Sequence, residues 1–348
     1  MQTTLKFPTG KLTLVASLLG LLAVPASLFG QGCVIARGGG GAMLSDSSGY
    51  LEPGQWQINT AYRYFKSHRH FAGDDEQTHR SDQGTEVYNL SNFIDVTATY
   101  AFSKRLSVNV TLPYVHHNRS SMYEHLGNNS GKRFTTSASG IADARIGANW
   151  WVFNPNEDDL KGNLSVGFGI KLPTGDDEAQ DYFQKAAGPQ LRYVDSSIQP
   201  GDGGTGVTVE LSGFRRLTHN LSVYGNGFYL INPEERNEKT GFSIPDGYMV
   251  RGGIDYRVEK VKGLIVSLGM RNEGVIAHDL FGGSRGSRRP GFAVAVEPGF
   301  TYGIGKFVGT VTVPVAVHRN RTTTFGSAKA GDAAFADWTL NTNFSYRF

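Results

Sequence analysis

The chain ends in Trp338-Thr-Leu340-Asn-Thr-Asn-Phe344-Ser-Tyr346-Arg-Phe348, a stretch in which apolar and polar side chains alternate. Successive side chains of a β-strand point to opposite faces, so this stretch has an apolar face and a polar face. Only Thr342 interrupts the apolar series. A strand with one face suited to lipid and the other to water is typical of a transmembrane β-barrel. The end of the chain therefore predicts a membrane-spanning strand.

The beginning of the chain has the organisation of an export signal. Two lysines precede an apolar run from Leu12 to Val24, and small residues follow it. The run is shorter than the ~20 apolar residues that a spanning helix needs. We therefore predict a signal peptide over residues 1–32, with cleavage near 26–32. An N-terminal membrane anchor is the weaker alternative.

Cys33 is the single cysteine, so the chain cannot form an internal disulfide. Lipidation of Cys33 stays open as an alternative, although the preceding Leu28-Phe-Gly-Gln-Gly32 lacks the leucine that usually stands three residues before a lipidated cysteine. Residues 33–53 are predicted to form a glycine-rich lead, and residues 54–348 the barrel.

Charge balance argues against nucleic-acid binding. The formal net charge is +3, and loss of the two signal lysines from the 34 basic residues leaves 32 basic against 31 acidic residues. A chain this close to neutrality has no electrostatic footprint for nucleic acid. The 45 glycines, 15 tyrosines and 21 phenylalanines favour closely paired strands.

Twelve candidate strands follow the lead, and the links between them alternate in length. Bacterial outer-membrane barrels have an even number of antiparallel strands, short periplasmic turns and longer external loops. We therefore predict an all-β, antiparallel up-and-down barrel of about 12 strands, with both termini in the periplasm. The short links lie at 102–104, 154–161, 217–220, 259–262 and 303–305, and the long links at approximately 66–91, 118–138, 174–205, 232–246, 274–290 and 319–336.

The aromatic end of the last strand resembles the signal that the outer-membrane assembly machinery reads. Its candidate residues are Phe344, Tyr346 and Phe348. The resemblance implies a location in the bacterial outer membrane. It also implies the assembly machinery, membrane lipid and lipopolysaccharide as partners, and it leaves the oligomeric state open.

Three further segments have a period of two that assigns their faces. In 106–114, 248–258 and 307–317, the apolar residues at alternate positions should face lipid. In 220–231, apolar residues occupy both faces, so the register of this segment stays open. Aromatic residues near both ends of the strands suit the two headgroup levels of a membrane. A soluble β-sandwich, the alternative, would explain neither the link lengths nor the aromatic terminus.

The polar faces of these strands carry charged residues that would point into the barrel. Burying charge is costly unless the groups pair or meet water. The set therefore predicts either a wet path for a solute or an interior closed by ion pairs. Twelve strands should leave a narrow bore, and the long link 174–205 is a candidate to fold over it. The predicted lumen-lining residues are Asp95, Asp143, Arg145, Lys171, Glu210, Arg251, Asp255, Arg257, Arg271, Glu273, Glu297, Asp337 and Arg347.

Catalytic interpretations are weak. Asp176-Asp177 and His278-Asp279 resemble the residue pairs of the omptin proteases only superficially, because adjacent residues of an extended chain point to opposite sides. For lipase chemistry, His117 and Ser120 lack an evident orienting group. We predict no catalytic residue, no cofactor and no metal site, and we do not expect an enzyme.

Three stretches together resemble a known family: Gln55-Trp-Gln-Ile-Asn-Thr-Ala-Tyr-Arg-Tyr64, Ser139-Gly-Ile-Ala-Asp143-Ala-Arg145-Ile-Gly-Ala-Asn149 and Gly167-Phe-Gly-Ile-Lys171-Leu-Pro173-Thr-Gly175. They are similar to stretches of the outer-membrane transporters grouped with meta-pathway phenol degradation, although Ala142 stands where that family usually has a glycine. The resemblance implies passive passage of a small solute, aromatic or hydrophobic in character. The alternative is a closed structural or surface-interaction barrel that binds a partner through its external loops.

Overall fold

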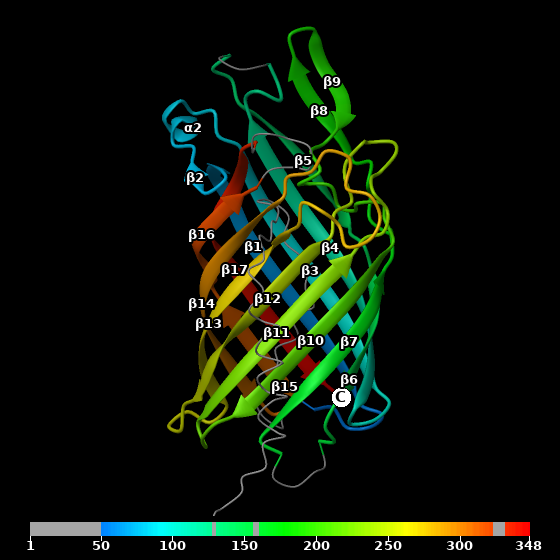
Figure 1. Ribbon diagram of the computed structural model, residues 1–348, viewed down its shortest axis with the longest axis vertical. Helices are drawn as coiled ribbons and strands as arrows, with labels where there is room; N and C mark the ends of the chain where they lie inside the picture. The colour runs from blue at the N-terminus through cyan, green and yellow to red at the C-terminus, as the bar shows by residue number, and fades with distance from the viewer. Residues whose placement is uncertain (1–49, 127–129, 156–159, 323–330) are drawn as a thin grey trace, which may run out of the picture.

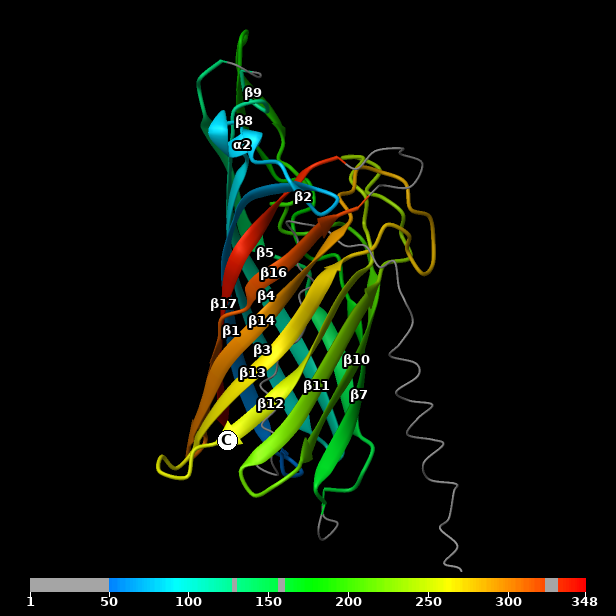
Figure 2. The same ribbon diagram turned by 60° about the vertical axis from the view of Figure 1, so that its left-hand side comes forward.

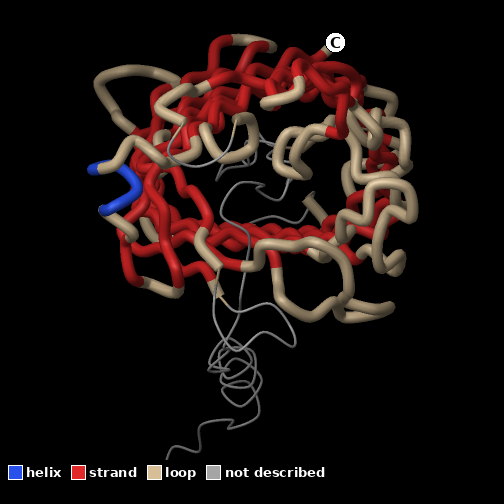
Figure 3. The backbone as a smooth tube through the Cα atoms, turned by 90° about the horizontal axis from the view of Figure 1, so that it is seen from above, coloured by secondary structure: helices blue, strands red, loops and turns tan. Residues whose placement is uncertain are grey.

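The computed structural model describes residues 50–126, 130–155, 160–322 and 331–348. Within these ranges the chain forms a closed antiparallel barrel of twelve wall strands, with its long loops gathered at one end (Figures 1 and 3). The predicted fold class is therefore confirmed. The predicted signal peptide and Cys33 lie outside the described residues. No helix in the described ranges is long and apolar enough to cross a membrane.

Each wall strand pairs with its neighbours in chain order, and two wall strands are interrupted and carry two labels each. The wall strands are β1 (Trp56–Ala72), β3 (Tyr88–Ala101), β4 (Leu106–Ser121), β5 (Phe134–Ile141) with β6 (Arg145–Trp151), β7 (Gly162–Lys171), β10 (Gly206–Arg216), β11 (Leu221–Ile231), β12 (Gly247–Arg257), β13 (Leu264–Val275), β14 (Gly291–Ile304), β15 (Phe307–Thr312) with β16 (Val315–Arg321), and β17 (Ala333–Arg347).

The remaining elements lie beyond the wall at the long-loop end. They are β2 (Asp75–Glu76), the short helix α2 (His79–Asp82), and the hairpin of β8 (Gln180–Lys185) and β9 (Gly188–Tyr193). The hairpin projects past the rim of the barrel in two views (Figures 1 and 2). Unlike the wall strands, it forms a separate two-stranded sheet.

The barrel closes where β17 pairs with β1, as the alternation of the last strand predicts. The two strands pair from Gln57 opposite Arg347 to Phe71 opposite Ala333. Their register shifts at two bulges near Ser67. The terminal residue takes part in the closure, because Phe348 N–H donates to the carbonyl of Trp56 at 3.0 Å and Trp56 N–H donates back at 3.2 Å. The C-terminus therefore lies at the short-turn end (Figure 1).

Two wall strands are interrupted, one at a proline and the other where the long loop after β7 contacts the wall. Pro314 lies between β15 and β16 and has no N–H to donate to the ladder, so its carbonyl alone bonds, accepting from Thr339 N–H at 3.0 Å. Residues 142–144 separate β5 from β6. There the hydroxyl of Thr174 accepts from Ala144 N–H at 2.8 Å and donates to the carbonyl of Ala142. The long loop after β7 thus supplies hydrogen-bond partners for the backbone groups at the gap in the wall.

The alternation assigns faces as predicted. In β4, Val110 and Leu112 are about half exposed while Thr111 between them is buried. The open register of β11 is resolved by its polar residues, because Asn226 is buried and its amide donates to the Ser212 hydroxyl inside the barrel. Phe228, on the same face as Asn226, therefore points inward.

The predicted long links are too long at their edges. Strands β1 and β4 continue to Ala72 and Ser121, inside the links predicted at 66–91 and 118–138. The reason is that the ladder of backbone hydrogen bonds continues beyond the lipid, where the outer face meets water and no longer needs apolar residues. The period of two therefore fades before the strand ends.

Aromatic rings gather in two groups at the short-turn end. The ring centroids of Trp56 and Tyr100 are 5.0 Å apart, and those of Tyr100 and Phe102 are 4.9 Å apart. Phe307 and Tyr346 form the second group, with ring centroids 4.5 Å apart. This position suits the headgroup level of a membrane.

Replacing Phe348 by Ala tests the role of the closing strand. We expect a clear loss of assembled protein in the outer membrane, because the terminal aromatic residue is the proposed assembly signal. The protein that does assemble should keep its stability, since the backbone bonds to Trp56 do not need the ring. Membrane yield and heat-modifiable migration on gels measure both. A normal yield would contradict the assembly role of Phe348.

Candidate functional site

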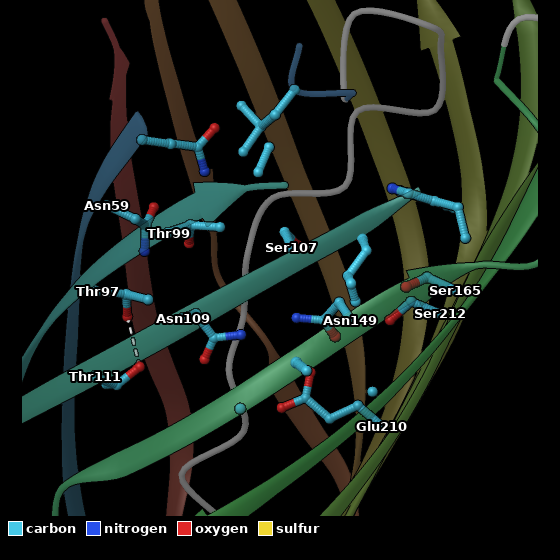
Figure 4. A pocket seen from close by; sticks show the side chains of 18 of the residues that line it. Asn59, Thr97, Thr99, Ser107, Asn109, Thr111, Asn149, Ser165, Glu210 and Ser212 are labelled. Carbon is cyan, nitrogen blue, oxygen red and sulfur yellow. Dashed lines mark hydrogen bonds between the residues drawn. The ribbon is translucent and has the colours of Figure 1, made fainter. Parts of the chain in front are cut away.

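A cavity of about 230 Å³ occupies the lumen near the short turns. Its wall comes from β1, β3, β4, β6, β7, β10 and β11, and most of its polar side chains are uncharged (Figure 4). Some of them bond one another, as the hydroxyls of Thr97 and Thr111 do at 2.8 Å. The uncharged polar side chains of this inner cavity include Gln57, Asn59, Thr97, Thr99, Ser103, Ser107, Asn109, Thr111, Asn149, Ser165, Thr208, Ser212 and Asn226.

A second cavity, of about 130 Å³, lies nearer the long loops. Apolar side chains from opposite parts of the wall and from the loops line much of it, while charged groups gather on one side. The apolar members of this outer cavity are Phe93, Pro200, Leu230, Phe242, Pro245 and Val275, and the charged members are Asp143, Arg145, Lys171, Asp177 and Asp202.

The long loop after β7 closes one side of the outer cavity. Asp143 holds its two ends, because its carboxylate accepts from the backbone N–H of Gly175 at 3.0 Å and of Asp202 at 3.2 Å. Lys171 pairs with Asp202 and lies 3.7 Å from Asp143. Gly201 packs so closely on Gly175 that an added Cβ would lie 2.7 Å from its backbone. The loop therefore folds inward over the barrel mouth.

Asp195 ties the same loop to two other parts of the barrel mouth. Its carboxylate accepts from Arg289 at 2.7 Å and lies 3.6 Å from Arg119 of β4. Burial alone would raise the pKa of Asp195, but the two guanidinium groups hold it well below its usual value. Asp195 therefore stays ionised and the loop stays anchored at neutral pH.

The wall formed by β12, β13 and β14 is different, because its charges pair with one another. Glu273 accepts from Arg271 at 2.9 Å and from Arg63 of β1 at 2.8 Å. Glu297, only 1% exposed, lies 3.4 Å from Arg251 and 3.6 Å from Arg271. Arg63 thus joins the first strand, β1, to β13 across the interior.

The predicted lumen-lining residues fall into three groups. Five line a cavity: Asp95, Asp143, Arg145, Lys171 and Glu210. Four form the ion-pair cluster of the β12–β14 wall: Arg251, Arg271, Glu273 and Glu297. The last four lie outside both cavities: Asp255 is buried in β12, Arg257 and Arg347 lie at the short-turn ends of their strands, and Asp337 pairs with Arg69 and Arg319 near the long loops.

Several lumen residues do not appear among the predicted ones. Phe65, Phe93 and Val115 form a buried apolar cluster on the inner face, although inward residues were expected to be polar. The uncharged residues of the inner cavity were also missed, yet they occupy the polar positions of the alternating strands. The period of two could have found them, because it depends on position and not on charge.

No group of three or more potential metal ligands occurs in the described ranges. Residues 72–193 match the model of a family described as "Putative MetA-pathway of phenol degradation", which confirms the resemblance over that part of the chain. A comparison with curated proteins finds no match.

Solved structures share the fold at low sequence identity. An outer membrane channel from Pseudomonas putida F1 has a TM-score of 0.54 and 12% identity, covering 86% of this chain and 97% of its own. The β domain of the Bordetella autotransporter BrkA (TM-score 0.45, 12% identity, coverage 85% and 100%) and the CymD monoaromatic hydrocarbon channel (0.40, 12%, 92% and 98%) fit less closely. Over its described residues the chain is therefore a twelve-stranded barrel of the outer-membrane type, and its residues 72–193 resemble the family linked to phenol degradation.

Proposed function

We propose that this barrel lets a small, weakly polar solute cross the outer membrane by passive diffusion. The observation that carries the proposal is the succession of two cavities along the lumen, the outer one largely apolar and the inner one lined by hydroxyl and amide groups. Apolar walls favour an uncharged ring, and uncharged polar groups hydrogen-bond a solute without holding it as tightly as charges would.

The size of the outer cavity favours a solute of one ring. Its volume is about 130 Å³, and an apolar protein cavity of about 150 Å³ holds one benzene molecule. The family match to phenol degradation agrees with an aromatic solute. We propose that Asp95, Asp143, Arg145, Lys171 and Glu210 lie along the path, and that the other predicted charged residues stabilise the wall. No catalytic role is proposed.

A barrel that binds a partner outside the membrane is the second candidate. The β8–β9 hairpin favours it, because Tyr182 and Leu191 are 57% and 54% exposed on an element that lies beyond the wall. Exposed apolar residues of this kind are typical of contact surfaces. This function would need the hairpin and not the cavities, so variants of the two regions distinguish the candidates.

A variant of Leu230 tests the solute path. Leu230→Trp should fill the outer cavity, which Leu230 lines, and should reduce single-channel conductance in planar bilayers at least threefold. It should also remove any block of the current by added phenol. Leu268→Trp is the matched control, because Leu268 is 52% exposed on the lipid face. Equal conductance of both variants and the wild type would contradict the proposed path.

The orientation of the barrel is part of the proposal: the short turns and both chain ends face the periplasm. Epitope tags inserted near Asp75 and at Pro189, in the long-loop region, should bind antibody on intact cells. A tag at Thr218, in the exposed turn between β10 and β11, should bind only after the membrane is permeabilised. The reverse labelling pattern would invert the barrel.

A further inference from the structure

Arg145 lies where the two cavities meet. Of the described residues that line either cavity, it is the only one that lines both. It is the first residue of β6, directly after the gap at 142–144 that the loop repairs. Its backbone is therefore fixed by the wall and by the loop, while its long side chain reaches into the lumen. Its side chain therefore borders the passage from one cavity to the other.

Among the described residues, the guanidinium of Arg145 has one hydrogen-bond partner. Its Nη2 donates to Asp95 Oδ2 at 3.1 Å, across β4. The other carboxylate oxygen of Asp95 is buried and accepts no hydrogen bond within the described residues. Two-point contacts between arginine and carboxylate are the strong and geometrically specific ones. The single contact of Arg145 to Asp95 is weaker than a two-point contact of this kind.

A second carboxylate lies within the electrostatic range of Arg145. Glu210 of β10 lines the inner cavity and interacts with the charge of Arg145. Within the described residues its side chain forms no ion pair, and in Figure 4 it points into the cavity near Asn149 and Ser212. Arg145 therefore contacts the carboxylate of Asp95, and the carboxylate of Glu210 is a second possible partner.

The wall between these carboxylates is formed by glycines and small polar residues. Gly147, Gly167 and Gly169 follow one another on the inner face of β6 and β7, between Arg145 and Glu210. A Cβ on Gly169 would lie 2.6 Å from the Thr208 hydroxyl, and one on Gly147 would lie 3.2 Å from Asn109 Oδ1. These positions are glycines because the neighbouring side chains of Asn109 and Thr208 lie directly over them.

We infer that Arg145 is a gate between the outer and inner cavities. Asp95 holds it across the junction in the closed state, and Glu210 receives its guanidinium in the open state. The inference rests on the proposed passage of a solute and names the residues that control it. The positive charge moves from one carboxylate to another, so the lumen keeps the same net charge in both states and no proton has to be transferred.

Single-channel recording of the full-length protein in planar bilayers, with potassium chloride as the only permeant, tests the gate. Asp95→Asn should weaken the closed state and raise the open fraction at least twofold. Glu210→Gln should weaken the open state and lower the open fraction by a similar factor. Arg145→Ala should abolish the transitions and leave a steady, larger conductance.

Arg285→Ala is the charge-matched control, because Arg285 is 77% exposed in an external loop where it pairs with Glu235; it should gate as the wild type does. Heat-modifiable migration checks that each variant is folded, and Arg145→Gln replaces Arg145→Ala if the latter does not fold. If the wild type conducts but Asp95→Asn and Glu210→Gln shift the open fraction in the same direction, or not at all, the gate is wrong while the path stands. If neither the wild type nor any Arg145 variant conducts, the proposed passage and the gate are both wrong.

Discussion

Closure of the sheet is the constraint on which the rest of this structure depends. Lipid offers no hydrogen bonds, so every backbone N–H and carbonyl within the membrane needs a partner in the protein. The pairing of β17 with β1 provides the last of these partners and leaves no free edge. Once the ring is closed, the inward residues share one narrow lumen. Residues as distant in sequence as Arg63 and Glu273 then come into contact.

Much of this fold could be predicted from the sequence, because it depends on local periodicity. The two faces of β4 and β17 follow from alternation alone, and the strand count follows from the lengths of the links. The register of β11 could not be settled in this way, since Tyr224 and Phe228 are as apolar as its outer residues. It depends on contacts with other strands, above all that of Asn226 with Ser212.

The candidate site was less accessible to prediction. Charge on the polar face indicated Asp95, Arg145 and Glu210 as inward residues, but alternation says nothing about which inward residues meet. Ion pairing across the lumen depends on the shear of the barrel and on loops that fold inward. The inward cluster of Phe65 and Phe93 contradicts a uniformly polar lumen. Alternation could not identify these inward phenylalanines, because the outer face of the same strands is also apolar.

The two sides of the lumen have different consequences for sequence change. The ion pairs of the β12–β14 wall depend on one another, because removing Glu297 would take from Arg251 its carboxylate partner and from Arg271 one of two, and breaking a buried pair typically costs about 3–5 kcal/mol. The hydroxyl and amide groups of the opposite wall are smaller and uncharged, so exchanging one for another leaves no buried charge without a partner. The ion pairs thus hold the β12–β14 side of the barrel in place. On the other side, uncharged groups can change without breaking an ion pair, so descendants of this chain could adapt to new solutes within the same frame.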